Sequence, residues 1–122
     1  MRATILLATA ALVTLGYGLP LTLAPLRWAR AVGWWLPDDA RLTRYLGRSL
    51  GTMILTLVAL VSFCAVHRPL EQLGAGVTAL ALGLVSLPHF VGLVEKSQPR
   101  FETLEGFAFL ALAIAFALLA RQ

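Results

Sequence analysis

The chain has 122 residues, of which 59% are hydrophobic and only 13% are charged, and its formal net charge is +4. About a quarter of the residues of an ordinary soluble domain are charged, so this composition excludes that class and indicates a membrane protein. The basic residues flank the apolar runs, which favours a role in orienting helices over nucleic-acid binding.

Four apolar runs are long enough to cross a bilayer, because a spanning helix needs roughly 20 residues. Backbone groups in lipid find no partner outside the segment, so the runs should be helical. Short connections favour an all-α, up-down-up-down four-helix bundle that forms one domain over residues 1–122. The runs cover about residues 3–24, 43–66, 72–94 and 103–120.

The first run follows a basic residue, as the apolar core of a secretory signal does. It continues to Ala24, which is too long for such a core, so we predict that it is the first membrane helix. Gly16, Gly18 and Pro20 fall close together and predict that this helix bends or loosens there.

The connection from Pro25 to Asp39 places Trp28, Val32 and Trp35 at i, i+4 and i+7. We expect a short interfacial helix between the first two spans, because tryptophan favours that depth. A lipid anchor and a lid over a ligand both remain open as its role.

Pro69 and Pro99 mark the two remaining connections, which are so short that consecutive helices must be antiparallel neighbours. Basic residues are unequally divided between the two ends of this arrangement. Seven Lys or Arg flank the first and third connections and three lie at the other end. The positive-inside rule then places both termini outside the cytoplasm.

Polar residues of the last three helices converge at the predicted cytoplasmic end. Arg48 lies on the order of 9 Å inside its helix, and Glu105 is its preferred partner. A polar pocket and a purely structural Arg–Glu bridge with His89 bonded nearby are both open interpretations. The members of this set are Tyr45, Arg48, His89, Glu95, Glu102 and Glu105.

No metal or cofactor is predicted. His67 and His89 should lie roughly 25 Å apart, which excludes a bis-histidine haem site. The spacing of His89, Glu95 and Glu102 does not match a compact ligand motif. Cys64 is the only cysteine, so no intrachain disulfide can form.

Several short motifs of this chain resemble those of the DoxX-like group of small bacterial four-helix membrane proteins. The resemblance implies a four-helix architecture and a bacterial inner membrane, and it assigns no catalytic residue. The motifs are Gly16-Tyr17-Gly18-Leu19, Pro25-Leu26-Arg27, Arg44-Tyr45-Leu46-Gly47 and a late Glu105.

The leading functional hypothesis is a non-enzymatic membrane protein that binds a lipophilic small molecule or a larger membrane complex. A pocket for such a ligand is apolar with a few polar groups at one end. The predicted ligand-binding residues are Arg48, Tyr45, Trp34, Trp35 and Glu102.

A membrane-embedded isomerase or cyclase is the alternative, acting on an isoprenoid, sterol-like or quinone substrate. Its acid and base must lie close together in a dry cavity. Glu105 or Glu95 would exchange protons with His89. A transporter or channel is the third class, and it needs a homo-oligomer because four thin helices enclose little volume.

Overall fold

The computed structural model describes all of residues 1–122, and the chain is helical outside short connections, with no strand. This confirms the predicted all-α class. Four helical segments are long and apolar enough to cross a membrane, which supports an integral membrane protein. They are Arg2–Leu23, Arg41–Val66, Arg68–Glu95 and Arg100–Ala120.

The first segment contains a π-helical turn in the region where glycine and proline predicted a loosened helix. It consists of α1 (Arg2–Val13), the π-helical turn η1 (Thr14–Gly18) and α2 (Leu19–Leu23). Pro20 lacks the N–H that would normally reach the carbonyl of Gly16. The indole N–H of Trp28 donates to that carbonyl instead, at 2.9 Å.

A short helix, α3 (Pro25–Ala31), follows the first segment. It lies where the interfacial helix was predicted but ends before Val32 and Trp35, and Trp35 is 83% exposed. Gly33 adopts a left-handed φ of +94°, and a Cβ there would be 3.5 Å from Pro99. This contact brings the connection, including Trp34, to the turn between the last two helices.

The second long segment, α4 (Arg41–Val66), packs against α1 and α2. Its backbone approaches theirs closely, because a Cβ added to Gly51 would lie 2.5 Å from the backbone nitrogen of Thr22. A Cβ on Gly47 would lie equally close to Pro25. These glycines therefore allow helix contact within the chain.

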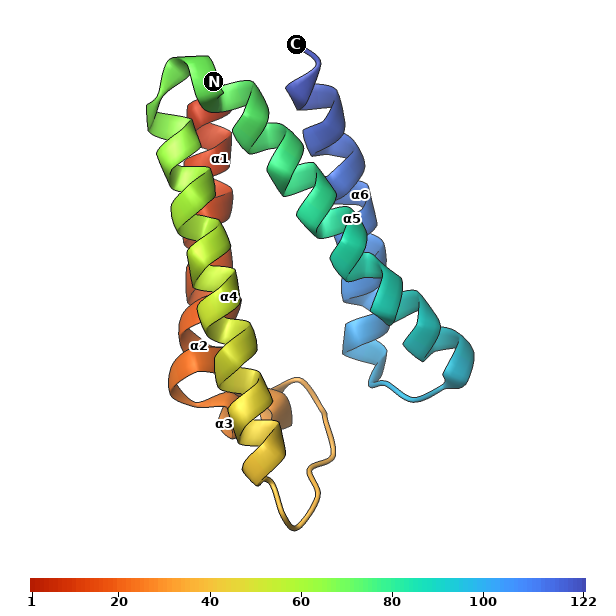
Figure 1. Cartoon of the computed structure of the whole chain (residues 1–122). Coiled ribbons are helices and arrows are strands. Elements are labelled where there is room, and N and C mark those ends of the chain that lie inside the picture. Colours follow the sequence, from red (N-terminus) through yellow and green to blue (C-terminus); the bar gives the residue numbers. More distant parts are fainter.

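A short 3₁₀ turn, η2 (Arg68–Leu70), leads into α5 (Glu71–Glu95), which packs extensively on α6 (Arg100–Ala120). Figure 1 shows two helix pairs, α1–α2 with α4 and α5 with α6, that come together near the termini and diverge at the other end. Both termini lie at the same end of the molecule.

The apolar core lies at the end that holds the termini, and all four long segments contribute to it. Its buried members are Leu6, Val61, Ala65, Ala75, Phe116 and Leu119. Farther from the termini the two helix pairs line a cavity, which borders the core at Val61.

Candidate functional site

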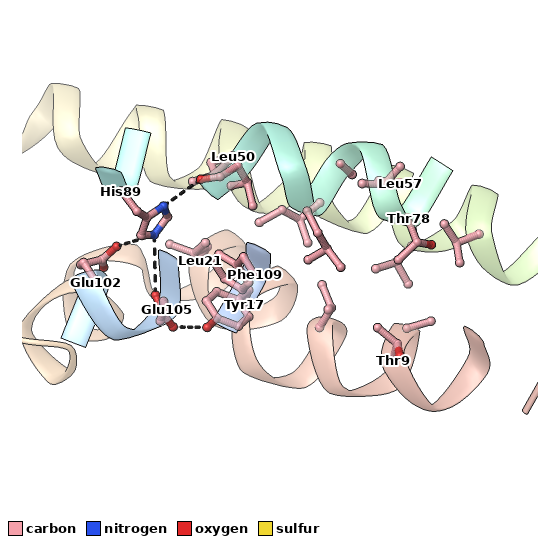
Figure 2. A pocket seen from close by; sticks show the side chains of 18 of the residues that line it. Thr9, Tyr17, Leu21, Leu50, Leu57, Thr78, His89, Glu102, Glu105 and Phe109 are labelled. Carbon is pink, nitrogen blue, oxygen red and sulfur yellow. Dashed lines mark hydrogen bonds and ion pairs between the residues drawn. The ribbon is translucent and has the colours of Figure 1, made fainter. Parts of the chain in front are cut away.

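A cavity of about 380 Å³ lies between the two helix pairs, and fifteen of its twenty lining residues are hydrophobic. Figure 2 shows that its charged side chains are grouped at one end, with Leu57 and Thr78 toward the other. We call the polar group at that end the polar cluster. Its members are Tyr17, Trp34, His89, Glu102 and Glu105.

The polar cluster draws its members from the first membrane segment, the connection after α3, α5 and α6, and none comes from α4. Tyr17 comes from the π-helical turn, Trp34 from the connection after α3, and His89 from α5. Glu102 and Glu105 begin α6, and their i, i+3 spacing puts both on the face toward α5. Each glutamate is only 8% exposed.

His89 has one ring nitrogen fixed by the backbone and the other directed at the glutamates. Its Nδ1 lies 2.7 Å from the carbonyl oxygen of Val85, which can only accept, so Nδ1 carries a proton. Its Nε2 lies 3.1 Å from Oε2 of Glu102. A bare ring nitrogen and a carboxylate oxygen are both acceptors. A second proton must therefore lie between them, either on Nε2 of His89 or on the carboxyl group of Glu102.

The two carboxyl groups are oriented in the same way by neutral donors. The indole N–H of Trp34 donates to Oε1 of Glu102 at 2.7 Å, and the hydroxyl of Tyr17 donates to Oε1 of Glu105. Oε2 of each glutamate is left facing His89, at 3.1 Å from Glu102 and 4.0 Å from Glu105.

Gln98, in the turn between α5 and α6, holds the backbone behind the histidine. Its side-chain amide donates to the carbonyl of His89 at 2.7 Å and to the hydroxyl of Thr103 at 2.9 Å. A Cβ on Gly106 would lie 2.6 Å from the Cβ of His89. The imidazole position thus depends on both the turn and a glycine of α6.

A second cavity, of about 350 Å³, adjoins the polar cluster on the side of the α5–α6 turn. It shares Trp34, His89 and Glu102 with the apolar cavity, and only two of its nine lining residues are hydrophobic. Glu95 lines this polar cavity and is absent from the apolar one.

The structure brings together four of the eight residues singled out from the sequence: Trp34, His89, Glu102 and Glu105. It leaves Tyr45, Arg48 and Trp35 on the outside, with Tyr45 68% exposed. The predicted Arg48–Glu105 pair is wrong, because Tyr17 and His89 are the partners of Glu105.

Helix rotation explains the misplaced arginine. Leu50 and Ile54 of α4 line the cavity, and Arg48 precedes Leu50 by two residues, which is about 200° around a helix. Its depth places it level with the site while its side chain lies on the exposed surface of α4.

Sequence reasoning missed Tyr17 and Gln98 as parts of the site. The signal for Tyr17 was present, since it stands between the two glycines that predicted a loosened helix and such turns are frequent at functional sites. Gln98 carried no comparable signal, because its role depends on how the turn folds back on α5.

Comparison of the chain with models of protein families, with curated proteins and with solved structures finds no match.

Proposed function

We propose that this membrane protein binds a lipophilic small molecule in the cavity between its helix pairs, with the head group of the ligand on the polar cluster. The observation that carries the proposal is an apolar cavity of about 380 Å³ with hydrogen-bonding groups at one end, among them the buried Glu102 and Glu105. Small-molecule pockets have this volume range and this distribution of polarity.

The chemistry of the polar cluster specifies the head group. The proton that His89 and Glu102 share can be donated to a ligand, and the phenol oxygen of Tyr17 and the carboxylate oxygens can accept, so a single hydroxyl or carbonyl oxygen suits the site. Isoprenoid alcohols, sterol-like molecules and quinones combine such an oxygen with an apolar body. We also propose that the chain is a member of the DoxX-like group.

A binding titration tests the proposal with farnesol and decylubiquinone as probes. Trp28 and Trp34 line the cavity, so their fluorescence should change on binding. Ala81→Phe fills the cavity from α5, and we expect it to weaken binding at least tenfold. Ala59→Phe places the same ring on an exposed position of α4 and should bind as the parent does. Equal affinity in both variants would reject the cavity as the site.

The orientation in the membrane is also part of the proposal. Arg41, Arg44, Lys96 and Arg100 lie at the end of the polar cluster, which we place in the cytoplasm of a bacterium. Alkaline phosphatase fused after Gln122 should then be active, whereas a fluorescent protein fused there should stay dark. The opposite pattern would invert the orientation.

Acid–base isomerisation is the second candidate, favoured by the proton that His89 and Glu102 must share. A pair with a mobile proton at the end of an apolar cavity can protonate a double bond and remove a proton elsewhere. Deuterium incorporation into an isoprenoid in D₂O tests this activity. Loss of deuterium incorporation in a normally folded Glu105→Gln variant supports the isomerase activity, with Glu105 as an acid or base. Unchanged incorporation in that variant rejects this role of Glu105.

A further inference from the structure

We propose that His89, Glu102 and Glu105 form a binding site for a single divalent transition metal ion, with Zn²⁺ the best match. Three ligands from the protein would leave one position open, and all three side chains line the apolar cavity. Zinc accepts imidazole nitrogen and carboxylate oxygen, commonly in tetrahedral geometry.

The distances fit one ion. One ligand atom from each residue can be chosen so that all three lie within 4.8 Å of one another. Zinc–ligand bonds of about 2.0–2.1 Å place neighbouring ligands of a tetrahedral site about 3.4 Å apart. Nε2 of His89 lies 3.1 Å and 4.0 Å from the two glutamate oxygens, on either side of that value.

The surrounding hydrogen bonds are those that orient metal ligands. A metal-binding histidine usually donates its other ring N–H to a carbonyl, and ligating carboxylates are themselves hydrogen-bonded. His89 has such a bond to Val85. Trp34 and Tyr17 donate to the outer oxygens of the glutamates, which leaves the inner oxygens available to a cation.

The charge of the site also calls for a cation. No Lys or Arg forms an ion pair with either glutamate, since the only other ion pair joins Asp39 and Arg41. With the proton that His89 and Glu102 share, the set carries a charge of −1, and once an ion has displaced that proton the protein groups carry −2. Buried charges are stable only when they are paired or bind a metal, and a divalent ion neutralises this set completely.

The polar cavity supplies a route for the ion. It reaches His89 and Glu102 from the side of exposed Glu95 and Ser97, so an ion need not cross the apolar cavity. All three ligands also line the apolar cavity, so an open position on that side would let the oxygen of a lipophilic ligand bind the ion. That last step depends on the proposed function, whereas metal binding itself does not.

Calorimetric titration of the chelator-stripped protein with Zn²⁺ in detergent tests the site. We expect one ion per chain. Because the ion replaces the shared proton, buffers of different ionisation enthalpy should report release of about one proton. Co²⁺ in place of zinc should give the strong visible absorption of a four-coordinate ion. A parent protein that binds neither ion overturns the proposal.

Matched variants identify the ligands. His89→Gln, Glu102→Gln and Glu105→Gln should each weaken binding at least tenfold. His67→Gln is the control, because His67 also bonds a carbonyl one turn earlier, that of Phe63, but is exposed outside the site. Loss of binding in His67→Gln, or its retention in His89→Gln, contradicts the site.

Two further measurements separate metal binding from folding and from the proposed function. Tyr17→Phe should weaken zinc binding by about tenfold, because the carboxyl group of Glu105 loses the hydroxyl that orients it. Tyr45→Phe should leave zinc affinity unchanged. Equal zinc affinity in the two variants contradicts the orienting role of Tyr17. Farnesol titration of zinc-free protein tests the proposed function separately. Farnesol binding without any zinc binding would overturn only the metal site.

Discussion

The two ends of the molecule are held together by different forces. At the termini, Leu6, Val61 and Phe116 from three helices form a buried apolar core. At the other end, the helix pairs are joined across a cavity by hydrogen bonds such as those of Tyr17 and Trp34. Close packing between the helix pairs stabilises the first end, whereas at the second end the pairs are separated by the cavity and joined by these hydrogen bonds.

The largest effect is expected at the core. Phe116→Ala should lower the free energy of unfolding by about 3–5 kcal/mol, because Phe116 is only 3% exposed and its removal leaves a void. Unfolding in mixed detergent measures it, and farnesol binding by the folded fraction should not change. If Phe116→Ala lowered the free energy of unfolding by less than Tyr17→Phe does, the core would contribute less to stability than the polar cluster.

The second-largest loss of stability is expected where two helices are in close backbone contact. Gly51→Ala should cost about 1–3 kcal/mol, because the new methyl group meets the backbone of Thr22. Gly76→Ala is the matched control, since nothing lies within 4 Å of a Cβ at that position. The same unfolding assay should find Gly76→Ala no less stable than the parent, and equal losses would remove the packing explanation.

The hydrogen bonds of the polar cluster rank third. Tyr17→Phe should lower the free energy of unfolding by about 1 kcal/mol, the usual net worth of one such bond. The loss stays small because His89 still faces Glu105. Tyr45→Phe, on the exposed surface, should be neutral in the same assay. A loss as large as that of Phe116→Ala would show that this end also depends on packing.

The smallest effect is expected at the exposed ion pair. Hydrogen bonds from Arg41 hold the pKa of Asp39 below its ordinary value. Any stabilisation that this ion pair gives the folded state is therefore present above the pKa that Asp39 has in the unfolded state. It is lost as the pH falls through the lower pKa that Asp39 has in the folded state. Carboxyl NMR should find Asp39 titrating below the ordinary value of an aspartate, while Asp39→Asn leaves unfolding nearly unchanged because the pair is in water. An Asp39 that titrates at the ordinary value would contradict the shift.

The positions of the helices along the chain were predictable, because the length of an apolar run decides what can cross a membrane. The expected run at 72–94 became Glu71–Glu95, and that at 43–66 became Arg41–Val66. Depth was predictable in the same way. His89, Glu102 and Glu105 were grouped by their depth and by the side of the membrane on which their helix ends lie, and the structure places them together.

Rotation about the helix axis and long-range loop contacts were not predictable. Arg48 had the right depth but lies on the exposed surface of α4. Trp34 reaches Glu102 from a connection in which the preceding Gly33 turns beside Pro99. Such contacts depend on residues far apart in the sequence, which local periodicity does not describe.

The π-helical turn at Thr14–Gly18 acts as a one-residue offset within the first membrane segment. A residue in a regular helix is separated from the next by about 100° of rotation. An extra residue in a regular helix would turn α1 relative to α2 by that angle, whereas the wider turn, closed by i to i+5 hydrogen bonds, takes up the residue locally. The facing of the segment toward two neighbouring helices at once is thus preserved despite one additional residue of chain length.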